Sequence, residues 1–151
     1  MRTLSLLFFS AATAIAADIS GIIKLDGPQP KRPPLQLTPE SRKLYEGRPY
    51  PRDEVELVSA KGEIQNVFVY IRKGLPAEKT YPAPKRPALL DQQRSMFRPR
   101  IQGLFVGQEF AMRNSDPIIH NVRSLSQENR PFNVAQPAGT PDRLKRFSDK
   151  E

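Results

Sequence analysis

Short runs rich in β-branched and aromatic residues alternate with polar, proline-rich stretches along the chain. The runs have the length of β-strands and are flanked by turn-forming residues, a pattern that predicts strands rather than helices. We therefore predict strands over six runs: Ile19 to Leu25, Val55 to Val58, Asn66 to Arg72, Ile101 to Val106, Glu109 to Arg113, and Ile118 to Leu125.

Two of these runs differ in the spacing of their apolar residues. In Val67 to Ile71 both alternating faces are apolar, which predicts a central strand with other elements packed on each side. Glu109 to Arg113 alternates instead, with Phe110 and Met112 on one face. That spacing predicts a strand with one buried face.

Proline separates the apolar runs. The chain has 16 prolines, and most of them fall in three clusters that we interpret as connections, because proline lacks the N–H that a central strand must donate. Turns are predicted at Asp26-Gly27-Pro28, Lys61-Gly62, Val106-Gly107 and Ser115-Asp116-Pro117. A short helix is predicted only at Thr38 to Tyr45, with Thr38 as its cap. The pattern as a whole predicts an all-β fold, an antiparallel β-sandwich.

The N-terminus has the features of a secretory signal peptide. Arg2 precedes an apolar stretch that begins at Leu4, and Ala14 and Ala16 provide the small residues of a cleavage site. We predict a signal peptide over residues 1–16 and one β-sandwich domain over residues 17–151, since about 135 residues suit one domain. The protein is expected to be periplasmic or secreted.

Composition narrows the possible partners. The formal net charge is +8, but the excess is spread over both halves of the chain and forms no block. We therefore expect no nucleic-acid partner, and no apolar run is long enough to predict a membrane span. The chain has no cysteine, which excludes disulfides, thiol nucleophiles and thiolate ligands.

The sequence lacks the parts of most catalytic sites. It has one histidine and no glycine-rich phosphate loop, nucleophile elbow or metal-binding helix motif. A triad of His120 with Asp116 and either Ser115 or Ser124 is conceivable, but the spacing does not require it. We predict that the protein is not an enzyme and has no catalytic residues.

The stretch from Arg113 to Val122 places His120 just inside a strand, after a tight polar turn. A neutral imidazole is a good copper or zinc ligand, and a strand would hold it rigidly. A single strand histidine is also a common hydrogen-bonded structural residue, so both interpretations stay open here.

These residues resemble a known family. Asn114-Ser115-Asp116 followed by His120-Asn121-Val122 is similar to the first-ligand region of cupredoxin-like exported bacterial proteins, the plastocyanin-like group also labelled methylamine utilisation proteins. Further similar pieces follow in the family's order over nearly the whole mature chain: Ile19-Ser20-Gly21, Leu25-Asp26-Gly27, Asn66 to Ile71, Gly74-Leu75, Leu90-Asp91-Gln92, Val106-Gly107-Gln108 and Phe132-Asn133.

The resemblance implies a Greek-key cupredoxin sandwich with a copper site built from this histidine, a cysteine, a second histidine and often a methionine. In the family the last three come from a C-terminal loop. Arg143 to Phe147 resembles the strand before that loop, and the sequence ends at Glu151. The chain therefore resembles a member truncated before the ligand loop, and whether the last strands are lacking stays open.

The resemblance also implies soft ligands elsewhere that this chain lacks. Ser95 and Arg100 stand where members often carry cysteine and histidine, and a similar pair is absent around Ser41 to Glu46. His120 is thus the one candidate metal ligand, in an incomplete site. No cofactor is assigned, and copper is expected to bind weakly if it binds. Met96 and Met112 are interpreted as packing residues.

Two functions follow from these observations. The first is an exported cupredoxin-like protein related to copper-binding electron-transfer proteins, with a redox partner and an incomplete blue-copper site. The second is a basic β-sandwich that binds an anionic cell-envelope polymer such as glycan, since arginine binds carboxylate and phosphate in a bidentate manner. The arginines considered for this role are Arg98, Arg100, Arg113, Arg123 and Arg130. The oligomeric state is left open.

Overall fold

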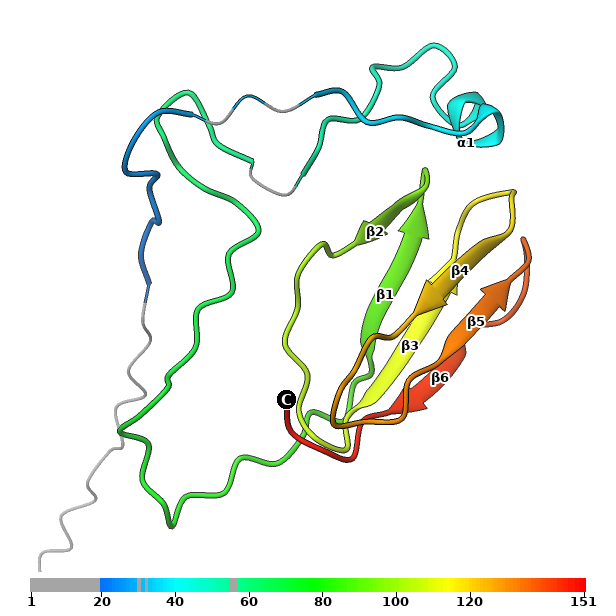
Figure 1. Cartoon of the computed structure of the whole chain (residues 1–151). Helices are drawn as coiled ribbons and strands as arrows, with labels where there is room; N and C mark the ends of the chain where they lie inside the picture. The colour runs from blue at the N-terminus through cyan, green and yellow to red at the C-terminus, as the bar shows by residue number, and fades with distance from the viewer. Residues whose placement is uncertain (1–19, 30, 32, 55–56) are drawn as a thin grey trace, which may run out of the picture.

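The computed structural model describes residues 20–151, apart from residues 30, 32, 55 and 56. The predicted signal peptide, residues 1–16, lies outside the described residues. One short helix and six strands are present: α1 (Pro39–Lys43), β1 (Ala88–Gln93), β2 (Met96–Arg98), β3 (Glu109–Asn114), β4 (His120–Arg123), β5 (Asn133–Gln136) and β6 (Arg143–Arg146). The prediction of an all-β fold is confirmed (Figure 1).

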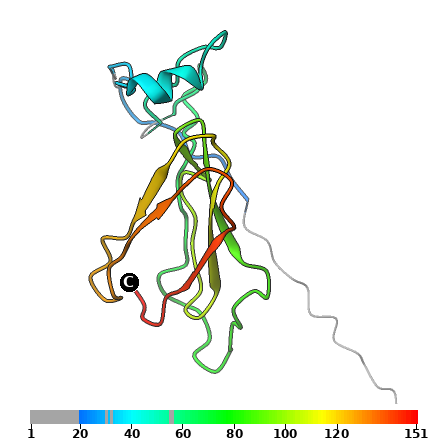
Figure 2. The same cartoon turned by 90° about the vertical axis from the view of Figure 1, so that its right-hand side faces the viewer.

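The strands form two sheets. A four-stranded sheet has the order β2-β1-β3-β6, and β4 pairs with β5 in a separate two-stranded sheet. Figure 2 shows the two sheets as separate layers. The pairs are antiparallel except for β1 and β3, which run parallel, so the prediction of a purely antiparallel fold was wrong for this pair.

The core lies between the two layers. Phe110 and Met112 of β3 and Val122 of β4 form its buried cluster, and Met112 is fully buried. This confirms the prediction that Phe110 and Met112 share a buried face, but the strand is not buried on that face alone, because Ala111 on the other face is 5% exposed. Phe147 closes the cluster, with its ring centroid 5.8 Å from that of Phe110. The core is small, so polar contacts between the layers matter for stability.

Predicted strands are confirmed only near the core. Glu109 to Arg113 corresponds to β3, and Ile118 to Leu125 contains the shorter β4. In the first two predicted runs, Ile19 to Leu25 and Val55 to Val58, the described residues form isolated β-bridges in place of strands. These bridges are Lys24–Glu63 and Val58–Ile64. The run from Ile101 to Val106 is irregular.

The prediction of a central strand at Val67 to Ile71 was wrong. The segment belongs to neither sheet, and its side chains are exposed. The segment is apolar at every position, but a strand also needs a neighbouring backbone to bond with, and none of the described segments lies beside this one in a ladder. Its apolar residues are therefore left at the surface.

The helix prediction is confirmed. Thr38 caps α1 by accepting a hydrogen bond from the Ser41 N–H through its hydroxyl, and a proline occupies the first turn. Just beyond α1, the Tyr45 hydroxyl donates to the Arg94 carbonyl at 2.6 Å. Burial raises the pKa of the Tyr45 hydroxyl above its ordinary value. Helix α1 is thereby tied to the turn between β1 and β2 (Figure 2).

No helix among the described residues is long and apolar enough to cross a membrane.

Candidate functional site

His120 is the first residue of β4, as predicted, and its ring is fixed by a carboxylate. The Nε2 atom lies 2.7 Å from Oδ2 of Asp116. The side chains are 15% and 5% exposed, so the pair is shielded from bulk water. A carboxylate on one ring nitrogen orients an imidazole and leaves the other nitrogen, Nδ1, for a ligand.

The polar turn before β4 is built by Asn114. Its side-chain oxygen accepts a hydrogen bond from the Asp116 N–H at 2.9 Å, and its side-chain nitrogen donates to the carbonyls of Ile118 and Gln136, each at 2.8 Å. Asparagine suits this position because its short amide can bond to nearby backbone groups. The Asn-Ser-Asp motif therefore positions the carboxylate that holds His120.

Asp116 also holds the hairpin turn between β1 and β2. The turn residues Arg94 and Ser95 have φ values of +52° and +57°, a left-handed conformation that side chains other than glycine disfavour. Their N–H groups donate to the two Asp116 carboxylate oxygens at 2.5 and 2.7 Å. One buried carboxylate thus compensates an unfavourable turn and orients the imidazole.

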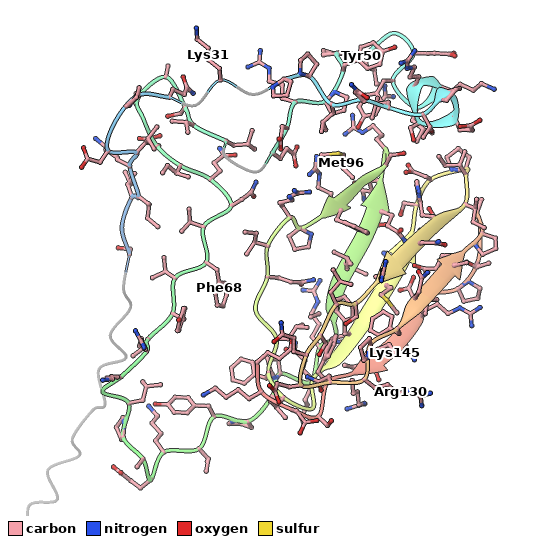
Figure 3. The ribbon with its side chains drawn as sticks, in the orientation of Figure 1. Lys31, Tyr50, Phe68, Met96, Arg130 and Lys145 are labelled. Atoms are coloured by element: carbon pink, nitrogen blue, oxygen red, sulfur yellow. The ribbon has the colours of Figure 1, made fainter. Side chains whose placement is uncertain are left out.

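A small cavity of about 80 Å³ lies beside His120. Its other lining residues are Gln92, Ser95, Met96, Phe97 and Asn121. Met96, at the start of β2, is buried, in agreement with a packing role (Figure 3). A cavity of this size has room for an ion or a few waters rather than an organic substrate.

The structure brings together two of the positions singled out by the resemblance. The Ser95 hydroxyl donates to the Ser41 hydroxyl at 2.8 Å, so helix α1 and the β1–β2 turn meet there. Ser95 lines the cavity beside His120. Arg100, the other substituted position, is exposed and does not line this cavity.

The residues present do not fit a blue-copper site. Such a site needs two histidines and a cysteine, whereas the sequence has one histidine and no cysteine. Among the described residues, no group of three or more histidine, cysteine, aspartate or glutamate side chains is placed to hold a metal ion. Any metal at His120 would depend on one imidazole.

A catalytic triad is not assembled around His120. The Ser115 hydroxyl donates to Asp91 at 2.9 Å, and the Ser124 hydroxyl accepts from the Ser126 N–H. Only the Asp116–His120 contact of the conceivable triad is present, without a serine nucleophile on the imidazole.

A buried amide network next to the site was missed by the sequence analysis. The Gln92 side-chain nitrogen donates to the Gln136 side-chain oxygen at 2.9 Å, and the Gln136 nitrogen donates to the Met112 carbonyl at 2.8 Å. Gln136 is fully buried and Gln92 is 2% exposed. These contacts join β5 to β3 and β1, across the two sheets. Glutamine gives no sequence signal for such burial, because it is usually exposed.

Two of the arginines considered for anion binding are engaged in ion pairs. Arg98 makes a bidentate contact with Glu54. Arg113 binds Asp142 at 2.9 and 3.0 Å, and this hydrogen bonding holds the pKa of Asp142 below its ordinary value. Both guanidinium groups are therefore already neutralised by a carboxylate.

Arg123 and Arg130 instead line two surface hollows that share Phe132. The hollow beside Arg130 has a volume of about 520 Å³ and is also bordered by Lys145, whose Nζ lies 5.5 Å from the Phe132 ring centroid. Figure 3 shows Arg130 and Lys145 on the same side of the molecule, near β6. Arg113 and Arg123 are not strand neighbours, because β3 and β4 belong to different sheets.

Fold and site together define an all-β protein in which a buried aspartate fixes a single histidine beside a small cavity. No family model, curated protein or solved structure matches this chain.

Proposed function

We propose that this chain is an exported cupredoxin-like protein, related to copper electron carriers, in which the blue-copper site is incomplete and His120 is the one candidate metal ligand. The observation that carries the proposal is the Asp116–His120 contact of 2.7 Å. Histidines that bind metals commonly donate their other ring N–H to a carboxylate, and His120 has this arrangement at the edge of a cavity.

A single imidazole limits what the site can do. Tight copper binding in proteins needs several ligands, and the intense colour of blue copper comes from a thiolate that this chain lacks. The proposal is therefore a metal site that binds copper weakly and does not carry electrons by itself.

Copper titration tests this function. We expect the purified protein to bind Cu²⁺ more weakly than micromolar, without an intense visible band, and His120→Ala to abolish the binding. Asn121→Ala is the matched control, because Asn121 lines the same cavity from the next position of β4. Calorimetry and visible absorption measure both properties. Sub-micromolar binding, or copper binding that survives His120→Ala, would contradict the proposal.

A second candidate function is the binding of an anionic cell-envelope polymer around Phe132. Arg123, Arg130 and Lys145 border the two hollows beside this ring, and within the described residues none of the three forms an ion pair. Their charges are therefore available to carboxylate or phosphate groups.

Salt-dependent retention on an anionic matrix tests the second function. Arg130→Gln with Lys145→Gln should lower the salt concentration needed for elution more than two neutralised cations elsewhere, because a bound polymer contacts these two together. The control is Lys31→Gln with Lys61→Gln, which removes the same charge at exposed positions; Lys31 lies far from Arg130 (Figure 3). Equal shifts for both double variants would mean that only net charge matters.

A further inference from the structure

The segment Val67-Phe68-Val69-Tyr70-Ile71, here called the apolar strip, is uncharged and exposed. Its side chains are 46% to 71% exposed. None of the backbone–backbone hydrogen bonds found among the described residues involves the strip. Figure 1 shows it as an extended trace to the side of both sheets. It has the sequence of a strand, high in β-branched and aromatic residues, without a partner.

The ends of the strip are defined by the backbone. Asn66 before it and Gly74 after it have φ values of +57° and +94°, which interrupt an extended conformation. The strip is held in place from one side, because the Phe68 ring lies directly on Gly103: a methyl group added there would be 2.4 Å from the ring. Phe68 also stacks on Tyr70, with ring centroids 6.2 Å apart. The strip is thus positioned by side chains, with its backbone groups left to bond elsewhere.

A true sheet edge in the same molecule is protected in a way that the strip is not. Strand β6 forms the outer edge of the larger sheet, and three of its four residues are basic: Arg143, Lys145 and Arg146. Charged side chains at an edge prevent a second chain from adding to it. The strip carries no charge at any of its five positions.

We propose that the apolar strip is an interface between two copies of this chain, formed by antiparallel pairing of the two strips about a two-fold axis at Val69. In this register Val69 faces Val69 of the second copy, Val67 faces Ile71, and Phe68 faces Tyr70. Aromatic and β-branched residues directly opposite one another stabilise an antiparallel pair.

The charged residues next to the strip favour pairing with a second copy of the chain in the antiparallel direction. In the antiparallel register Arg72 and Lys73 of the two copies lie at opposite ends of the paired strips, away from each other. A parallel pairing would place Arg72 against Arg72, and like charges directly opposite one another are destabilising. The strip is therefore complementary to itself, as a two-fold interface requires. Five paired residues form a small interface, so the dimer should be weak and depend on concentration.

Disulfide crosslinking tests the register, since the chain has no cysteine of its own. We expect Val69→Cys to form a covalent dimer under mild oxidation, because the two residues face each other within disulfide range. Val67→Cys alone should not crosslink, whereas a mixture of Val67→Cys and Ile71→Cys should give the mixed dimer. Equal crosslinking of Val67→Cys and Val69→Cys, or no mixed dimer, would overturn the register.

Mass measurement tests the dimer itself. Light scattering on the unmodified protein should show a mass that rises from one to two chains with concentration, and Val69→Lys should hold it at one. Leu125→Lys is the matched control, because Leu125 is 75% exposed against 71% for Val69 and lies outside the strip. Added salt should strengthen the dimer by screening the net charge of +8. A single-chain mass at all concentrations, or equal loss in both lysine variants, would overturn the proposal.

Discussion

Asp116→Ala is expected to lower the free energy of unfolding by about 3 kcal/mol, because three donors lose their acceptor at a largely buried position. The donors are His120 and the N–H groups of Arg94 and Ser95. The turn that these two residues form is already unfavourable, since both have positive φ. Urea denaturation followed by circular dichroism measures the loss.

Two further variants identify the cause of this loss. Asp116→Asn keeps one acceptor oxygen and should cost less than Asp116→Ala. Arg94→Gly should recover about 1 kcal/mol in the Asp116→Ala background by relieving the left-handed conformation. A loss below about 1 kcal/mol for Asp116→Ala would mean that water replaces the carboxylate without cost.

Gln136→Leu is expected to lower the free energy of unfolding by about 2 to 3 kcal/mol, since a buried carbonyl and a buried amide each lose one hydrogen bond. The Met112 carbonyl loses its bond to the Gln136 nitrogen, and the Gln92 nitrogen loses its bond to the Gln136 oxygen. Gln92 keeps a bond to the Arg113 carbonyl at 3.1 Å, which limits the cost. Urea denaturation followed by circular dichroism measures this change in the free energy of unfolding.

The double variant Gln92→Leu with Gln136→Leu tests whether the two amides act as a pair. Removing both partners should cost less than the sum of the single losses, by about 1 kcal/mol or more, because neither amide is then left unpaired by the other. Additive losses would show that each glutamine acts only through its backbone contacts. Gln93→Leu is the comparison at an exposed position of β1, where the substitution removes one hydrogen bond, from the Gln93 side chain to Asp91.

The site was only partly predictable. The polar turn and the strand beginning near His120 follow from Asn114 to Val122, because asparagine and aspartate favour turns and the apolar residues that follow favour a strand. The contact of Asp116 with Arg94 and Ser95 joins positions more than twenty residues apart. An Arg-Ser pair is not a typical sequence for a two-residue hairpin turn, so the pattern gave no indication of it.

The strands, like the site, were only partly predictable from the sequence. Local pattern was sufficient for β3, whose apolar face supplies two residues of the core. Strand β1 was not predicted, because its second half, Asp91 to Gln93, is polar and becomes a strand by pairing on both sides with β2 and β3. Val67 to Ile71 has the stronger strand pattern and belongs to neither sheet.

The sequence by itself determined the class of the fold, the capped helix at Thr38, the location of His120 and the absence of any thiol ligand. These properties depend on local conformation or on composition. Only the tertiary structure decided which strands pair, that Gln92 and Gln136 are buried together, and that Asp116 joins a distant turn to His120. A β-ladder and a buried hydrogen bond each need a partner from elsewhere in the chain, so the residues on one side alone cannot specify them.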